Sequence, residues 1–348
     1  MTLPRNAHLW LPGYLKCVVR PRSGPRRVFV MIGDHYEPLR GGASEELGRA
    51  RVARWREEWP HIAGRHRDSL GNRPVYTFFY PEEEYRPHLL EPLADLARNG
   101  IADVEIHIHH DGEGERNFRD RMARFVEALH EGHGLLRKVD GRVRFGFIHG
   151  NWALANSRPD GRYCGLNHEL AILRDLGCYA DFTLPSAPSA AQTRTVNSIY
   201  WATDQQGRPK SHDEGAPFTD PSASGDLLMI QGPLALNWRE RSHGLVPRIE
   251  VGELAGHNPV TRQRVHLWLD FAPRLGDAVF IKLFAHGAWE KNTDSLLRRD
   301  LDRAFEMLAA ECRARGAQLH YVSAWQMYQA VLNTRQTDAK NMRGTAAA

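Results

Sequence analysis

The stretch DVEIHIH, residues 103–109, decides the fold class, because its side chains alternate strictly in character. Successive side chains of a β-strand point to opposite faces of a sheet. Ile106 and Ile108 therefore share one face, which suits packing under helices, and His107 and His109 share the other. In a parallel barrel, this alternation separates the side of a strand that faces the lumen from the side that faces the surrounding helices.

Short apolar runs and helical segments alternate along most of the chain. The predicted strands are 27–33, 74–80, 103–109, 143–149, 178–183, 277–286 and 318–323. The predicted helices are 44–59, 86–98, 115–133, 166–176, 296–315 and 324–333, and Pro60 is expected to end the first of them. Strands that alternate with helices of this length indicate a parallel sheet or barrel. We therefore predict an α/β fold, a distorted (β/α) barrel of about seven parallel strands.

Residues 204–264 interrupt this rhythm. Their turn residues are dense and their apolar runs, such as DLLMI at 226–230, are short, which predicts a β-rich insertion or lid. A segment that orders only under some conditions is the alternative. The expected organisation is an N-terminal extension (1–25), a first barrel part (26–203), the insertion (204–264), the remainder of the barrel (265–333) and a flexible tail (334–348).

The composition is that of a globular protein. Hydrophobic residues make up 42% and charged residues 25% of the 348 residues, which excludes wholesale disorder and a small disulfide scaffold. The net charge is +4 and the basic residues are spread out, so no nucleic-acid partner is expected. No apolar run approaches the roughly 18 to 20 residues of a membrane span.

The four cysteines form no C-x-x-C pair, and the first thirty residues lack the apolar core of a signal peptide. Reduced thiols and a cytoplasmic location are therefore expected. The sequence leaves the oligomeric state open.

Five predicted strands finish in a charged or imidazole side chain. These residues are Asp34, His109, His149, Asp181 and His286. Catalytic groups of parallel barrels collect at the carboxyl ends of the strands. In the strand at 277–286, Lys282 and His286 share the face opposite Ile281 and Leu283. We expect these strand ends to meet at one rim; the alternative is that each strand simply ends where solvent begins.

The densest group of metal-ligand side chains is HIHHDGE, residues 107–113. Neutral imidazoles and carboxylates suit a divalent ion of the zinc class. The H-x-H pattern allows His107 and His109 to reach one ion from one face, and Asp111 or Glu113 could add a carboxylate. The alternative is a chance cluster, because the chain holds 18 histidines.

Three other segments offer polar groups. Asp34 and His35 follow the first strand and offer a base and a possible ligand, unless they form a turn before Pro38. Residues 149–152 (HGNW) place an imidazole, an amide and an indole together, and the indole suits either a sugar ring or the core. His212 in the insertion is a possible substrate contact, with a solvated loop as the alternative.

The order of these motifs resembles that of the polysaccharide deacetylase (NodB-like) group of the glycoside hydrolase/deacetylase barrel superfamily. The resemblance covers residues 28–330 outside the insertion. The family's T-F-D-D motif corresponds to the segment around Asp34 and His35, which implies Asp34 as the base and His35 as a metal ligand. Its H-[ST]-x-x-H motif corresponds to residues 109–113, which implies His109 and Glu113 as ligands, with His107 as an alternative.

Two further segments carry the resemblance. Residues 279–286 are similar to the family's final L-x-H motif, which implies His286 as the general acid. Residues 145–188 resemble a divergent subgroup found with surface-polysaccharide biosynthesis; residues 149–152 replace the family's arginine–proline motif, and Asp181 lies near its aspartate motif.

The resemblance implies a metal-dependent hydrolase, with a divalent ion such as zinc, that removes an N-acetyl group from a saccharide. The expected substrate-binding residues are His149, Asn151, Trp152, Asp181, Lys282 and His212. Three alternatives stay open: an amidohydrolase-like enzyme, a glycosidase, and a non-catalytic sugar-binding relative.

Overall fold

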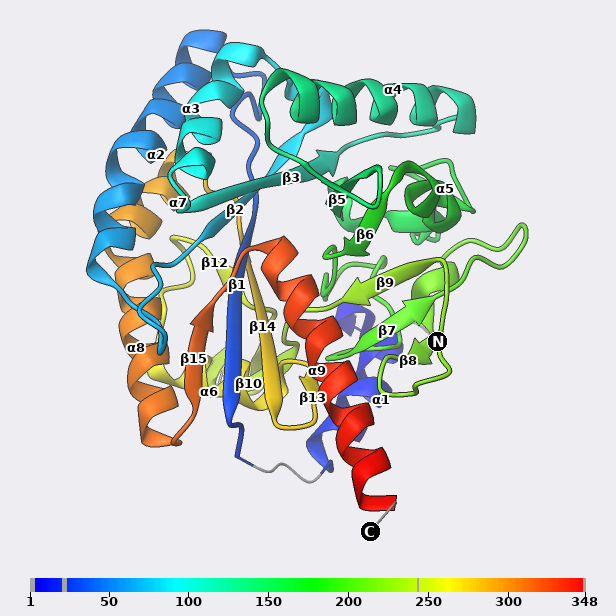
Figure 1. Ribbon diagram of the computed structural model, residues 1–348, viewed down its shortest axis with the longest axis vertical. Helices are drawn as coiled ribbons and strands as arrows, with labels where there is room; N and C mark the ends of the chain where they lie inside the picture. Colours follow the sequence, from blue (N-terminus) through cyan, green and yellow to red (C-terminus); the bar gives the residue numbers. More distant parts are fainter. Residues whose placement is uncertain (1–3, 21–23, 243, 347–348) are drawn as a thin grey trace.

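The computed structural model describes residues 4–20, 24–242 and 244–346, and the predicted N-terminal extension and tail lie partly outside these ranges. All seven predicted strands are present and belong to one sheet (Figure 1). They are β1 (Arg27–His35), β2 (Tyr76–Pro81), β3 (Ala102–Ile108), β5 (Arg142–His149), β6 (Cys178–Asp181), β14 (Ala278–Ala285) and β15 (Gln318–Tyr321).

The central part of the sheet is parallel. β14, β1, β2, β3, β5 and β6 follow one another in that order, each parallel to its neighbour. β15 pairs with the first half of β1, at residues 27–30, and β2 pairs with the second half, at residues 32–35. The prediction of a mostly parallel, barrel-like α/β fold is confirmed.

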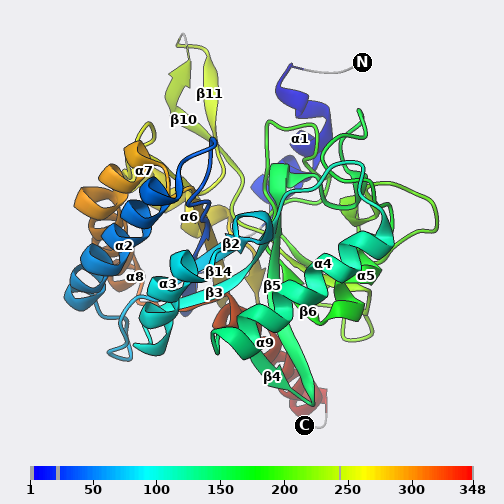
Figure 2. The ribbon, with the colours of Figure 1, turned by 90° about the horizontal axis from the view of Figure 1, so that it is seen from above.

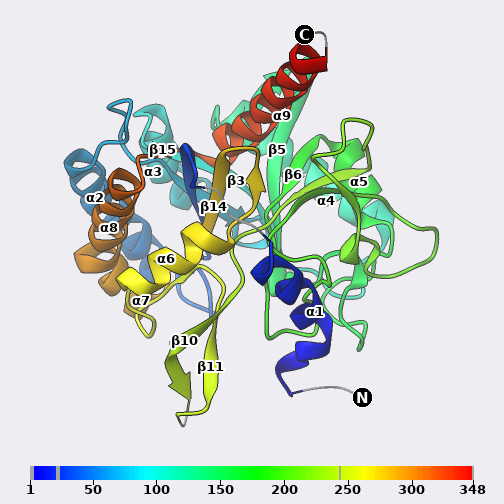
Figure 3. The ribbon, with the colours of Figure 1, turned by 90° about the horizontal axis from the view of Figure 1, so that it is seen from below.

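Shorter strands extend this sheet. β9 (Leu227–Ile230) lies parallel to β6, and β7 (Ile199–Ala202) and β8 (Ala216–Pro217) follow it antiparallel. At the other edge, β12 (Glu253–Leu254) and β13 (Arg274–Leu275) pair with β14. In the middle of the sheet, β4 (Arg137–Val139) pairs with β5. The segment 204–264 thus gives β8, β9 and β12 to the main sheet. It also forms the hairpin β10 (Ala235–Ser242) and β11 (Val246–Glu250), which projects from the body of the protein (Figures 2 and 3).

Helices cover the sheet in two groups (Figures 1 and 2). α2 (Glu45–Arg65), α3 (Pro87–Arg98), α7 (Glu290–Ser295) and α8 (Leu301–Ala314) lie on one side, and α4 (Glu115–Glu127) and α5 (Glu169–Leu176) on another. The remaining helices are α1 (Ala7–Val18), α6 (Arg262–Phe271) and α9 (Ala324–Ala346). None of the helices among the described residues is both long and apolar enough to cross a bilayer.

Pro60 does not end the first long helix as expected. α2 continues through it to Arg65. A proline inside a helix costs about 3 kcal/mol, because it removes a hydrogen bond and crowds the preceding turn. Ile62 and Ala63 beyond it are buried against the core, and this packing offsets the cost.

Strand alternation produces two separate cores. The outer core lies between strands and helices and includes Ile32, Tyr36, Ile106 and Ile108. The inner core fills the inside of the sheet with Met31, Phe79, Ile148, Phe182 and Phe280, and α9 adds Met327 and Val331 to it. The predicted sidedness of Ile106 and Ile108, toward helices, is therefore what the structure shows.

Candidate metal centre

Three elements bring imidazole rings together at the carboxyl end of the sheet. His35 is the last residue of β1 and lies two positions beyond Gly33, so the two residues share one face of the strand. On that face Gly33 contacts the inner-core residues Met31 and Phe79. Its ring centroid lies 4.9 Å from that of His107 on β3 and 4.8 Å from that of His286, which follows β14. Because parallel strands end at the same edge, residues far apart in sequence meet here.

Glu37, His107 and His109 form a compact group, which we call the Glu37 cluster. One ligand atom from each lies within 4.8 Å of the others. Oε1 of Glu37 is 3.1 Å from Nε2 of His109 and 3.7 Å from Nε2 of His107. Both rings therefore turn the same nitrogen toward one carboxylate oxygen.

The second nitrogen of each ring is already fixed. Nδ1 of His107 donates to the carbonyl oxygen of Ile148 at 2.8 Å, and Nδ1 of His109 lies 2.5 Å from Oε1 of Glu83. Metal-binding histidines commonly hold their other nitrogen in this way, with a carbonyl or a carboxylate. Nε2 of His107 is buried and has no hydrogen-bond partner among the described residues. The cluster therefore fits a divalent ion of the zinc class.

The electrostatics of the cluster favour a bound cation. Burial on its own raises the pKa of Glu37, but the neighbouring imidazoles of His107 and His109 outweigh burial and hold that pKa well below its usual range. Burial lowers the pKa of His109, whereas Glu37 and Glu83 raise it, with a net value of about 9. In the absence of an ion, a proton on His109 offsets part of the negative charge of Glu37 and Glu83, and a divalent cation can take its place.

An aromatic side chain stands beside these rings. The indole of Trp152 is half-buried, with its ring centroid 6.3 Å from that of His35 and 6.5 Å from that of His286. Burial lowers the pKa of His286 to about 4, so this imidazole is neutral at pH 7. The arrangement offers an ion-binding group, a neutral imidazole and a flat apolar surface close together. We use the word mouth for the place where Trp152 and His286 lie beside His35.

The structure does not bring Asp34 into this group. Asp34 lies between Ile32 and Tyr36, which belong to the outer core, and its side chain is fully buried. Its Oδ1 accepts from the amide of Gly287 at 2.7 Å and its Oδ2 accepts from the hydroxyl of Tyr76 at 2.8 Å. These contacts fit a residue that positions the loop after β14 and lend no support to the predicted role as base.

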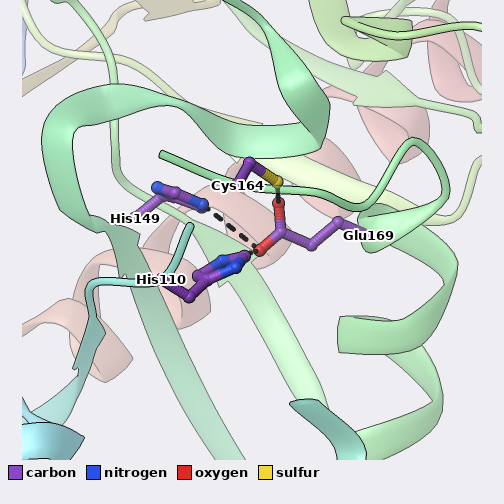
Figure 4. Close-up of side chains that lie close together, drawn as sticks. All are labelled: His110, His149, Cys164 and Glu169. Atoms are coloured by element: carbon purple, nitrogen blue, oxygen red, sulfur yellow. Dashed lines mark hydrogen bonds and ion pairs between the residues drawn. The ribbon is translucent and has the colours of Figure 1, made fainter. Parts of the chain in front are cut away.

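Glu113 and His149 also lie apart from the Glu37 cluster. The carboxylate of Glu113 accepts from Asn117 at 2.7 Å and pairs with Arg121 at 2.8 Å. The ring of His149 points to the helix-facing side, toward Glu169 (Figure 4). The predicted ligand role of Glu113 and substrate contact of His149 therefore find no support in their contacts.

The other predicted substrate contacts differ in exposure. Asn151 is exposed, whereas Asp181 and Lys282 are buried. Nζ of Lys282 donates to the carbonyl of Phe182 at 2.8 Å, and burial lowers the pKa of this lysine to about 7. His212 is buried rather than in a solvated loop, and neither ring nitrogen has a hydrogen-bond partner in the described part of the chain. Their binding roles stay predictions.

Comparison with known proteins gives similar solved structures at low similarity and no related sequence. Neither a protein-family model nor a curated protein matches the sequence. One similar solved structure is the Xyl-CE4 domain of a multidomain xylanase from the hindgut metagenome of Trinervitermes trinervoides, with a TM-score of 0.35 and 14% identity over 87% of this chain and 90% of that chain. Another is Puue allantoinase, with a TM-score of 0.43 and 12% identity over 89% of this chain and 93% of that chain. At these values neither carries an argument about the reaction.

Two carboxylates of the site were not expected from the sequence. Glu37 lies two residues beyond His35, so the alternation that turns His35 inward also turns Glu37 inward. That spacing was a usable signal. Glu83 follows β2, and nothing local to its sequence indicates that it orients His109.

Proposed function

We propose that the protein is a metal-dependent hydrolase that removes an N-acetyl group from a saccharide. The observation that supports it is the Glu37 cluster, three ligand-type groups within 4.8 Å of one another beside an aromatic mouth. Catalytic zinc sites commonly have three protein ligands and keep one position open for water or substrate. His109 is 31% exposed, which leaves the cluster open on that side.

In this proposal Glu37, His107 and His109 hold the ion, with Glu83 orienting His109. A bound ion of the zinc class supplies Lewis acidity, which activates a water molecule and polarises a carbonyl. Arg40 pairs with Glu37 and helps to fix the carboxylate.

His286 carries the proton. Its neutral imidazole accepts a proton from the attacking water and delivers it to the amine nitrogen, which cannot leave as an amide anion. The products are acetate and the free amino sugar. His35 packs against His286 and positions it, and Asp34 holds the amide of Gly287 next in the chain.

The sugar is proposed on two grounds. Trp152 offers an indole face at the mouth, and flat indole surfaces suit the apolar face of a sugar ring. The motif order resembles the polysaccharide deacetylase group, and on that resemblance we assign the reaction to surface-polysaccharide or glycan biosynthesis. A cytoplasmic location is proposed separately, from the reduced thiols that the cysteine pattern predicts.

The test combines metal analysis with acetate release over a panel of N-acetylated saccharides. We expect His107→Ala to lose one ion per chain together with activity, and His286→Ala to keep that ion and lose at least about 100-fold in kcat. His257→Ala is the matched control, because this histidine is 66% exposed and pairs with Glu253, away from the cluster.

Each alternative predicts a different result. Release of reducing sugar without acetate would indicate a glycosidase, and acetate-free hydrolysis of cyclic amides would indicate an amidohydrolase-like enzyme. Saccharide binding without turnover by the metal-loaded protein would indicate a binding protein. A His107→Ala variant with full metal content and activity would overturn the assignment of the site.

A further inference from the structure

A second group of ligand-type side chains lies on the helix-facing side of the same strands (Figure 4). It consists of His110, His149, Cys164 and Glu169, which we call the Glu169 cluster; all four are buried, and one ligand atom from each lies within 4.8 Å of the others. They come from four places: the turn after β3, the end of β5, the loop before α5, and the first residue of α5.

The carboxylate of Glu169 lies between the other three groups. Its Oε1 is 3.1 Å from Nε2 of His110 and 3.5 Å from Nε2 of His149. Its Oε2 is 3.3 Å from Sγ of Cys164 and accepts from the amide of Ala155 at 2.7 Å. Three different ligand types thus converge on one buried point.

The side chains of this cluster cannot satisfy one another's hydrogen-bonding groups. Nδ1 of His149 lies 2.5 Å from the carbonyl oxygen of Gly150, and a carbonyl only accepts, so the ring hydrogen is on Nδ1. Nε2 then presents a lone pair to a carboxylate oxygen of Glu169, which is also an acceptor. This Nε2, like Nδ1 of His110, has no hydrogen-bond partner among the described residues. Two buried acceptors that face each other are costly unless a cation lies between them.

We propose that His110, His149, Cys164 and Glu169 form a second metal site that holds a structural ion of the zinc class. Four protein ligands without an open position are typical of structural zinc sites. A tetrahedral zinc shell separates neighbouring ligand atoms by about 3.3 to 3.7 Å. The ligand atoms of the cluster lie within 4.8 Å of one another, so its widest separations shorten by about 1 Å when an ion binds. The thiolate favours zinc over magnesium or calcium.

This ion would fasten the segment that carries Trp152. Residues 150–168 contain two three-residue 3-10 turns, Gly150–Trp152 and Leu154–Asn156. The rest of this segment is neither helix nor strand. Five of their non-glycine residues have positive φ: Asn151, Trp152, Ala155, Asn156 and Tyr163. Such backbone persists only where its surroundings hold it. An ion ligated by Cys164 and Glu169, near the end of the segment, and by His110 and His149 would keep this backbone in place.

The inference does not rest on the proposed hydrolase activity, and its test does not need a substrate. The protein is produced with cobalt in place of zinc, and its near-ultraviolet spectrum is recorded. We expect a thiolate-to-cobalt charge-transfer band that disappears in Cys164→Ser. The band should persist in Cys312→Ser, the matched control for a buried cysteine on α8, and in His107→Ala, which affects only the Glu37 cluster.

Metal content gives a second readout. Zinc-loaded Cys164→Ser should hold one ion per chain fewer than zinc-loaded wild type, and it should unfold at a lower temperature. The absence of the band in cobalt-loaded wild type, or its persistence in Cys164→Ser, would overturn the proposal, and the wild-type spectrum decides even if a variant fails to fold. Loss of acetate release in His107→Ala with an intact band would leave this site standing, so the two proposals fail independently.

Discussion

The variant Asp34→Asn distinguishes two roles for the carboxylate of Asp34: positioning the loop that carries His286, and acting as the general base. The side chain is fully buried and accepts from the amide of Gly287 and the hydroxyl of Tyr76. Asparagine has nearly the same volume. Its carbonyl can accept from Gly287, and its amide can donate to the Tyr76 oxygen, whose own hydrogen can turn away. The substitution therefore removes the charge and keeps the geometry.

The magnitude follows from the pKa of Asp34. Burial raises it from 3.8 to about 7, against the hydrogen bonds from Gly287 and Tyr76 that lower it. The difference between a pKa of 3.8 and a pKa of about 7 corresponds to about 4 kcal/mol. Because the folded pKa exceeds the unfolded one, the native state binds more protons between these values. The free energy of unfolding therefore falls as pH rises from about 4 to about 7, and levels off above that range.

The assay is urea unfolding between pH 4 and pH 8, followed by tryptophan fluorescence. Asp34→Asn should match the wild type at pH 4 and exceed its free energy of unfolding at pH 8 by up to about 4 kcal/mol. If Asp34 only positions the loop, acetate release should stay within about tenfold of the wild type, whereas a lost general base costs about 10²- to 10⁴-fold. An unchanged pH dependence would refute the linkage. A loss of 100-fold or more in a folded variant would restore Asp34 as the base.

Three further substitutions test the packing, the mouth and a buried ion pair. In Gly287→Ala the new Cβ would lie 2.1 Å from Oδ2 of Asp34, so the variant should lose about 1 to 3 kcal/mol in denaturant unfolding, and an unchanged midpoint would contradict this contact. Trp152→Ala should raise KM for a saccharide about tenfold with kcat nearly unchanged, and an equal fall in kcat would argue against a binding role. Arg264→Leu leaves the fully buried Glu250, its partner at 2.6 Å, uncompensated and should cost about 3 to 5 kcal/mol; adding Glu250→Leu should recover most of that loss, and strictly additive losses would contradict the pairing.

The seven main strands could be predicted because their signal is local. Each is a short apolar or alternating run, and the alternation in residues 103–109 also gave the correct sides for Ile106 and Ile108. What the sequence could not indicate was pairing over long distances. β9 lies in the segment expected to form an insertion, yet it is parallel to β6, and nothing in its four residues specifies that partner.

The same alternation explains why the predicted site residues divide between the two faces of the sheet. Asp34 and His35 are neighbours in an extended strand, so both could not face the lumen, and His35 is the one that does. Glu37, two positions further, shares that face, and its spacing from His35 is the sequence signal for it. Cys164 could not be connected with His110 from the sequence, because 53 residues and the whole of α4 separate them in the chain.

The turn that follows β3 sends adjacent imidazoles in opposite directions, His109 toward the Glu37 cluster and His110 toward the Glu169 cluster. Deleting a single residue from 102–108 would shift the phase of the pleat, so that each ring would arrive in the other's compartment. The Glu37 cluster and the Glu169 cluster, on opposite faces of the sheet, therefore both constrain the length of β3. It can exchange one apolar side chain for another far more readily than it can gain or lose a residue.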